Sequence, residues 1–111
     1  MTIKDNCTPP SRKELDLRPV EGSKADLEMA ALAKAMGHPI RVKILRFLSK
    51  KNDCMCADIV SEIQIPQSST SQHLKVLKES GLITGTISGA STCYCIDQNV
   101  LRRARLLISS L

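Results

Sequence analysis

The sequence DIVSEIQIPQSSTSQHLKVLKESGLI at residues 58–83 predicts two short helices joined by a tight turn. In the second helix, Thr70, Leu74 and Leu77 recur at helical spacing and form an inward stripe. Gly81 stands where a C′ glycine in the left-handed conformation ends a helix. We therefore expect one helix at residues 58–63, a turn at residues 64–66 and a second helix at residues 67–80.

The outward side of the second helix carries hydrogen-bonding groups. Amides and hydroxyls can bind base edges or phosphate oxygens, and a lysine neutralises phosphate charge. This side therefore has the side chains that a helix in the major groove of DNA requires. The alternative is a solvated helix face rich in serine and glutamine. The candidate DNA-binding residues are Gln67, Ser68, Ser69, Ser71, Gln72, His73 and Lys75.

Length and composition place limits on the rest of the chain. Its 111 residues suit one domain with a single core, and 16 basic against 11 acidic residues give a net charge of +5, which suits a polyanionic partner. The apolar runs are far shorter than the roughly 20 residues that cross a bilayer. Since the N-terminus also lacks a hydrophobic signal core, we expect a cytoplasmic protein without membrane contact, whose five cysteines are thiols, metal ligands or redox sensors.

The N-terminal region changes character near residue 22. Residues 1–22 mix charges with prolines and show no sustained period, which predicts a flexible tail. Ser23, three residues before an aspartate, resembles a capping box that begins a helix at residues 23–36. A further helix begins at Pro39, because proline is favoured at the first helical position. Residues 23–111 form the expected DNA-binding and dimerisation domain.

After Gly81 the apolar pattern alternates with period two. The segments LITGTI and STCYCI, separated by a turn at residues 88–90, predict a two-stranded hairpin, which directly after a helix-turn-helix is a wing. The final helix, residues 99–111, is apolar around much of its circumference and needs two covering surfaces. We expect a partner subunit to supply one of them together with residues 23–36; the alternative is burial within one chain. The predicted fold is mainly α with a small β-hairpin, a winged helix-turn-helix that forms a homodimer.

Three segments resemble the ArsR/SmtB family of bacterial winged-helix repressors. They are LAKAMGHPIRVKIL at residues 32–45, STSQHLKVL at residues 69–77 followed by Gly-Leu-Ile, and the wing strand with Tyr94 and Ile96. The resemblance covers about residues 25–111. It implies a homodimer that blocks transcription at double-stranded operator DNA, needs no cofactor for that binding, and is released by an inducer such as a metal ion, arsenite or a reactive sulfur species.

The inducer site of the family is not present in this sequence. Aligned on the Asp-Leu of the arsenic and cadmium sensors, the family thiols fall at Met55, Ala57 and Val60, none of which is cysteine. The family's other common site uses Asp, His and Glu on the terminal helix, whereas LRRARLLISSL contains none of these. Neither ligand set carries over to this chain.

The chain has a different arrangement of thiols. Cys54 with Cys56, and Cys93 with Cys95, form two Cys-X-Cys pairs, and each pair lies on one face if its backbone is extended. Four thiolates could bind zinc or cadmium, and three suffice for arsenite; Cys7 could complete the site. The strand register stays open, because the family alignment points Cys54 and Cys56 inward whereas a core-facing Tyr94 turns Cys93 and Cys95 away.

Other functions of the cysteines remain open. A disulfide across the two strands is feasible, so a thiol-redox or persulfide switch is the main rival to metal sensing. The cysteines could also be small buried hydrophobes, or ligands of a structural zinc in a protein that does not bind DNA. The sequence contains no glycine loop for nucleotides, no carboxylate pair and no Ser-His arrangement, so we predict that it is not an enzyme.

Overall fold

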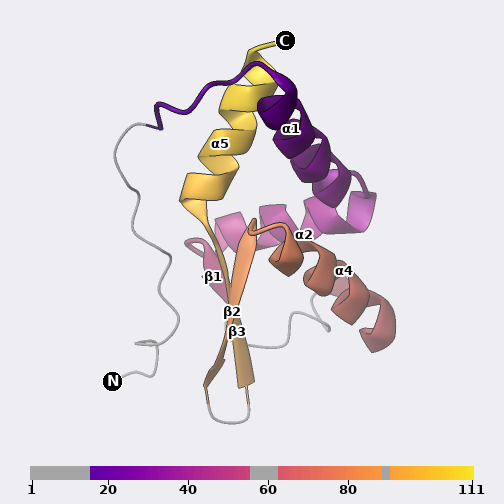
Figure 1. The fold of residues 1–111 in the computed structure, drawn as a ribbon. Helices are drawn as coiled ribbons and strands as arrows, with labels where there is room; N and C mark the ends of the chain where they lie inside the picture. The colour runs from indigo at the N-terminus through magenta and orange to yellow at the C-terminus, as the bar shows by residue number, and fades with distance from the viewer. Residues whose placement is uncertain (1–15, 56–62, 89–90) are drawn as a thin grey trace.

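The computed structural model describes residues 16–55, 63–88 and 91–111. In these ranges the elements are α1 (Ser23–Met36), α2 (Pro39–Lys50), β1 (Cys54–Met55), α4 (Gln67–Glu79), β2 (Ile83–Ser88), β3 (Ser91–Ile96) and α5 (Gln98–Ser109). Helices α1 and α5 pack together at the top of Figure 1, α2 crosses beneath them, and the β2–β3 hairpin extends downward. The mainly helical winged fold is confirmed, while the helix predicted at residues 58–63 lies outside the described residues except for Ile63.

Local chemistry sets both ends of α2. The Nδ1 atom of His38 accepts a hydrogen bond of 3.0 Å from the backbone N–H of Ile40, so His38 is the N-cap and Pro39 occupies the first turn, as predicted. After the helix, Asn52 and Asp53 have φ of 60° and 72°. Asparagine and aspartate tolerate this left-handed region better than other side chains, and the two residues turn the chain into β1.

The beginnings of α1 and α5 differ from each other. The predicted capping box at Ser23 is wrong: Gly22 is the N-cap, with φ of 108°, and no side chain caps the helix. Helix α5 begins with a side-chain cap, since Asp97 Oδ1 accepts from the backbone N–H of Asn99 at 2.9 Å and of Val100 at 3.4 Å. This cap fixes the terminal helix to the end of the wing.

The hairpin extends into a three-stranded antiparallel sheet of order β1-β3-β2. Ile83 lies opposite Ile96, and Gly85 lies opposite Tyr94, so these residues share the face that packs on the helices. Gly81, with φ of 86°, ends α4 and leads into β2, as its position in the sequence predicts. The first strand of the wing therefore follows α4 after a short turn.

One core joins the helices to this face of the sheet. Its largest fully buried apolar side chains are Ile44, Leu48, Ile63, Leu77, Leu82, Ile83, Ile96 and Leu107. Helix α5 buries Ala104 and Leu107, whereas Ile108 and Leu111 are exposed. Within the described ranges, no helix combines the length and apolar character that crossing a bilayer requires.

Candidate functional site

Helix α4 has one apolar side and one polar side. Thr70, Leu74 and Leu77 are buried against the core, with exposed fractions of 5% or less. On the opposite side the predicted DNA-binding residues Gln67, Ser68, Ser69, Ser71, Gln72 and Lys75 are all exposed, and only His73 is half-buried. The predicted division of the helix is confirmed. Contact of these side chains with DNA remains a prediction.

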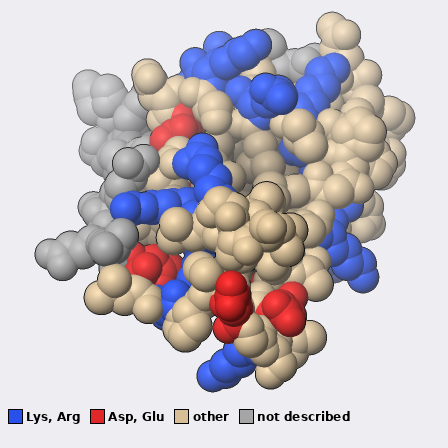
Figure 2. Space-filling model, turned by 90° about the horizontal axis from the view of Figure 1, so that it is seen from above, with Lys and Arg blue, Asp and Glu red and all other residues tan. Residues whose placement is uncertain are grey.

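Sequence reasoning missed a cation at the angle between α4 and the wing. A Cβ atom on Gly85 would lie 3.3 Å from Tyr94 Cε1 and 3.5 Å from Lys78 Nζ, so the Lys78 ammonium lies over strand β2. Figure 2 shows that lysine and arginine side chains are also spread over the face seen from above Figure 1. The net positive charge therefore does not locate a DNA surface.

His73 connects α4 to the junction between α1 and α2. Arg41 Nη1 donates to His73 Nδ1 at 3.3 Å, and the ring centroids of His73 and His38 are 4.3 Å apart. Burial lowers the pKa of His73, and the neighbouring His38 and Arg41 lower it further. The imidazole is thus held neutral, with its proton on Nε2, because a guanidinium can only donate.

One cysteine of each pair is brought together by the pairing of strands β1 and β3. Cys54 lies opposite Cys95, with 4.0 Å between their Cα atoms, and Met55 lies opposite Tyr94. Met55 and Tyr94 pack against the core, while Cys54 and Cys95 share the other face with Cys93. The family alignment, which points Cys54 inward, is therefore wrong for this residue, because strand pairing with Tyr94 turns Met55 toward the core instead.

The cysteine face is oxidised in this structure. Cys54 and Cys95 form a disulfide across the strands, as the sequence allows, and Cys93 is disulfide-bonded too. Cys93 and Cys95 are 2% and 4% exposed. No group of three or more His, Cys, Asp or Glu that could hold a metal ion occurs in residues 16–55, 63–88 and 91–111. Since Cys56 and Cys7 lie outside these ranges, the four-thiolate site stays a prediction.

Asp53 links the cysteine strands to α5. Its carbonyl accepts from the N–H of Ile96 at 2.8 Å, and its carboxylate accepts from Gln98 Nε2 at 2.9 Å. Asp53 precedes Cys54, and Ile96 follows Cys95, so these contacts flank the disulfide on both strands. Asp53 therefore joins the chain next to the disulfide to the first residue of α5.

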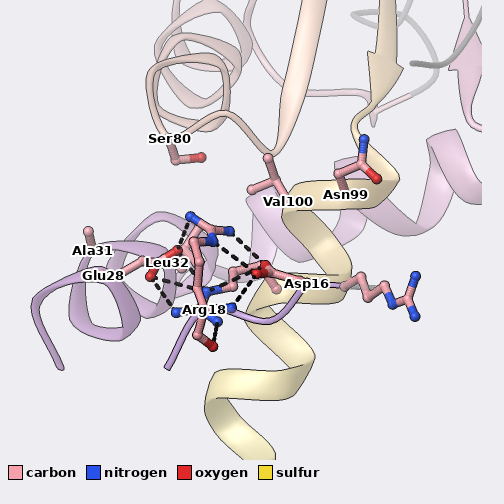
Figure 3. Close-up of a pocket in the computed structure, with 10 residues that line it drawn as sticks. Asp16, Arg18, Glu28, Ala31, Leu32, Ser80, Asn99 and Val100 are labelled. Carbon is pink, nitrogen blue, oxygen red and sulfur yellow. Dashed lines mark hydrogen bonds and ion pairs between the residues drawn. The ribbon is translucent and has the colours of Figure 1, made fainter. Parts of the chain in front are cut away.

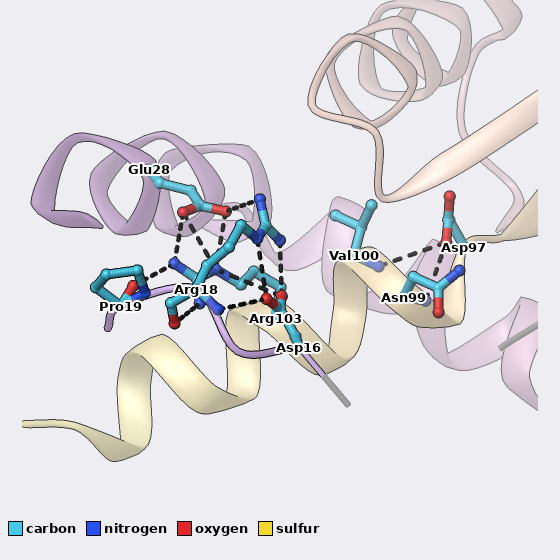
Figure 4. Close-up of polar contacts among 8 residues, drawn as sticks. All are labelled: Asp16, Arg18, Pro19, Glu28, Asp97, Asn99, Val100 and Arg103. Carbon is cyan, nitrogen blue, oxygen red and sulfur yellow. Dashed lines mark hydrogen bonds and ion pairs between the residues drawn. The ribbon is translucent and has the colours of Figure 1, made fainter. Parts of the chain in front are cut away.

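A buried arginine ties α5 to α1 and to residues 16–20 of the predicted tail. The side chain of Arg103 is buried, with 3% of its surface exposed. Its Nη2 donates to Glu28 Oε1 at 2.9 Å and to the carbonyl of Pro19 at 2.6 Å (Figure 4). Its Nη1 donates to the carbonyl of Arg18 at 3.1 Å. Asp16 pairs with Arg18 at 2.7 Å. Hydrogen bonds from Arg103 hold the pKa of Glu28 below its usual value, and those from Arg18 do the same for Asp16.

A cavity of about 480 Å³ lies beside this cluster, between α1, α5 and the end of α4 (Figure 3). Leu32, Val100 and Ser80 line it, together with the charged groups of the cluster. The sequence contains one feature that indicates a polar cluster in this region. Arg103 stands three residues after Val100 and four before Leu107, so a cation interrupts the apolar side of α5 and requires a partner.

Comparisons with known proteins agree with this arrangement. Residues 38–84 match the family model of bacterial regulatory proteins of the arsR family. The chain is 36% identical over 63 residues to the transcriptional repressor SmtB of Mycobacterium tuberculosis, a match that covers 57% of this chain and only 46% of SmtB. It is 30% identical to the arsenical resistance operon repressor of Staphylococcus xylosus, over 67% of this chain and 70% of that protein.

A solved structure shares the fold. The transcriptional regulator HlyU of Vibrio vulnificus superposes with a TM-score of 0.59 at 28% identity, over 78% of this chain and 91% of HlyU. The chain thus spans about half the length of SmtB but most of the other two proteins. All three are named as regulators of transcription rather than as enzymes, in agreement with the prediction from the sequence.

Proposed function

Because this chain belongs to the ArsR family of bacterial regulatory proteins, we propose that it represses transcription by binding double-stranded operator DNA through α4. The observation that carries the proposal is the exposed polar side of α4, whose opposite side is buried against the core. Side chains such as Gln72 can make paired hydrogen bonds to a base, and Lys75 can neutralise a phosphate. We place the protein in the cytoplasm, where it reaches DNA.

Fluorescence anisotropy with the protein's own promoter fragment tests this surface. Gln72→Ala should weaken operator binding about tenfold or more, since a good base contact contributes about 1–3 kcal/mol of discrimination. Ser71→Ala should weaken it less. Ser49→Ala is the matched control, because Ser49 is an exposed helical serine on α2, away from α4 and from the proposed dimer surface. Unchanged operator affinity in both α4 variants would refute the assignment.

The active form is a homodimer formed through α1 and α5. Leu27 on α1 and Ile108 on α5 are 73% and 49% exposed, and Leu111 just beyond α5 is 92% exposed, although α1 and α5 already pack on each other. A second subunit would cover these side chains and place two copies of α4 to bind a palindrome. In sedimentation analysis, Ile108→Glu should give monomers, whereas Val42→Glu, on the partly exposed side of α2, should leave the dimer intact.

The inducer acts on the cysteine face, and oxidation is the first candidate. In a reducing cytoplasm Cys54 and Cys95 rest as thiols. Hydrogen peroxide would take two electrons and two protons from the pair, forming the disulfide and two molecules of water. The observation that favours this switch is the direct opposition of the two residues, which lets the bond close between paired strands. The contacts of Asp53 with Ile96 and Gln98 would carry the change to α5. A persulfide could act on the same pair.

Binding of a thiophilic metal or metalloid to the reduced cysteines is the second candidate. Cys54, Cys93 and Cys95 share one face, but as the oxidised structure places them they do not form a group that could hold a metal ion, so reduction of the bond between Cys54 and Cys95 has to come first. Three thiolates would then satisfy trivalent arsenic, and zinc or cadmium would use a fourth ligand, Cys56 or Cys7. The relative from Staphylococcus xylosus is named for arsenical resistance, which supports a metalloid.

Two cysteine variants separate these candidates in the anisotropy assay. The reduced protein is titrated with peroxide, a persulfide donor, zinc, cadmium and arsenite. A redox switch at the pair of Cys54 and Cys95 predicts release by peroxide or persulfide in the wild type but not in Cys54→Ser, and the response of Cys93→Ser shows whether the bond of Cys93 is needed as well. A three-thiolate site predicts release by arsenite in the wild type and in neither variant. Tight binding that no agent relieves would exclude both inducers.

A further inference from the structure

Arg41 joins three helices at one point of the molecule. From its place in the first turn of α2, its Nε donates to the carbonyl of Ala35 at 2.6 Å and its Nη2 to the carbonyl of Lys34 at 3.2 Å. Both carbonyls belong to the last turn of α1, where carbonyl groups lack the usual helical partners. The carbonyl of Lys34 also accepts from the backbone N–H of Gly37 at 3.2 Å. The remaining Nη1 donates to His73 Nδ1 on α4 at 3.3 Å. One side chain therefore contacts both the proposed dimerisation side and the proposed DNA-binding helix.

The partners of Arg41 require a particular state of His73. An arginine has no acceptor atom, so the contact exists only while Nδ1 of His73 keeps its lone pair. His38 cannot replace that acceptor, because its own Nδ1 already accepts from the backbone N–H of Ile40. The ring of His38 lies against the ring of His73 at a tilt of 42°. The position of His73 is thus set from two directions, by a hydrogen bond and by a ring contact.

This junction complements the apolar packing of α4. Thr70, Leu74 and Leu77 hold the helix against α1, α2 and β2 and set which side of α4 is buried. Apolar contacts are not directional, so they limit a small rotation about the helix axis less tightly than a hydrogen bond does. The hydrogen bond to His73 is directional, and Gln72, the candidate base-reading residue, is its neighbour in the sequence. A small rotation of α4 would move the Gln72 amide away from the base edge that it reads.

We propose that Arg41 is a positioning residue for operator recognition: through His73 it fixes the rotation of α4 and thereby sets operator affinity without contacting DNA. The proposal rests on the assignment of α4 as the DNA-binding helix. It predicts that loss of Arg41 lowers affinity for the operator more than affinity for unrelated DNA, because phosphate contacts tolerate a small rotation better than base contacts do. The contacts of Arg41 also connect the end of α1 directly to the DNA-binding helix α4.

The test compares Arg41→Gln with Arg46→Gln in the whole 111-residue chain. Arg46 is an exposed arginine on the same helix, and no polar contact of its side chain occurs in the described residues, so the control removes the same charge without the junction. Each variant is titrated against the promoter fragment and against a scrambled DNA of equal length at one salt concentration. Arg41→Gln should lose about tenfold in the ratio of the two affinities, and Arg46→Gln should leave that ratio unchanged.

Variants at His73 distinguish positioning from a general loss of folding. His73→Asn places an amide oxygen near the position of Nδ1 and should keep a higher ratio of operator affinity to scrambled-DNA affinity than His73→Leu, which keeps bulk but removes the acceptor and should match Arg41→Gln. The double variant Arg41→Gln, His73→Leu should be no weaker than either single variant. Circular dichroism at the assay temperature confirms that each variant is folded.

Three results would overturn the proposal. They are an equal affinity ratio in Arg41→Gln and Arg46→Gln, full affinity in His73→Leu, and additive losses in the double variant. If the wild type itself fails to bind its promoter, the proposed function falls together with this inference. If the wild type binds and Arg41→Gln behaves as the control does, only the inference falls.

Discussion

Arg103 and Arg41 hold two different regions of the molecule together, and their partners differ in charge. Arg103 is buried between α1, α5 and residues 16–20, where Glu28 and Asp16 compensate its charge. Arg41 is half-buried between α1, α2 and α4, and its partners are two carbonyls and one neutral imidazole. Among the described residues no carboxylate pairs with Arg41.

This difference in partners suggests different roles for the two arginines, one in folding stability and one in the position of the DNA-binding helix. A buried guanidinium paired with carboxylates is costly to disturb, because removing one partner leaves the other charge without compensation. A guanidinium that donates to a histidine loses that contact whenever the histidine gains a proton. We therefore expect the Arg103 cluster to fix the dimerisation side, and the Arg41 junction to respond to small changes in conditions near the DNA-binding helix.

The largest expected effect is on folding stability at the Arg103 cluster. Arg103→Gln should lower the free energy of unfolding by about 3 kcal/mol, the lower end of the range for breaking a buried ion pair, since Glu28 and Asp16 are partly exposed and can be rehydrated. Arg102→Gln, at the preceding residue of α5, should cost much less. Urea denaturation followed by circular dichroism measures both, and equal losses would contradict the comparison.

A smaller effect is expected on the folding stability at acidic pH. Arg18 and Arg103 lower the pKa values of Asp16 and Glu28 in the folded protein, whereas the unfolded carboxyls titrate near 4. The unfolded state therefore binds protons first, and the contribution of the cluster, complete above about pH 5, is lost as the pH falls toward the lowered values. Urea midpoints between pH 3 and pH 6 should fall less steeply for Arg103→Gln than for the wild type. Parallel pH profiles would show that the carboxylates are not coupled to Arg103.

The two regions also differ in how far the sequence predicts them. The faces of α4 follow from a local period, so Thr70, Leu74 and Leu77 could be placed inward and Gln72 outward without any tertiary information. The start of α2 followed from Pro39 in the same way. These features depend on neighbours a few positions apart in the chain.

Features that depend on contacts between residues far apart in the chain could not be predicted from the sequence. The facing of Cys54 and Cys95 depends on strand register, since a shift of one residue exchanges the two faces of a strand. The contact between Arg41 and His73 joins residues 32 positions apart, and that between Arg103 and Glu28 joins residues 75 apart. A polar residue on an apolar helix side signals that a partner exists, but the sequence does not identify the partner.

The smallest expected effect is on stability near neutral pH, and it tests the Arg41 junction alone. Burial, then His38 and Arg41, lower the pKa of His73 in the folded protein below the value of about 6.5 in the unfolded chain. Stability is therefore complete above that value and falls as the pH drops from about 6.5 toward the lowered pKa, because the unfolded state takes up the proton first. The His73→Asn variant has no titrating group at this position, so its urea midpoint should change less than that of the wild type between pH 5 and pH 7.

A control is needed because a second imidazole, that of His38, lies against the same ring. The comparison is therefore repeated in a His38→Asn background, where the effect of His73→Asn on the pH profile should persist. If the midpoints with and without His73→Asn run in parallel over this range, His73 is as easily protonated in the folded protein as in the unfolded chain, and the junction does not respond to pH.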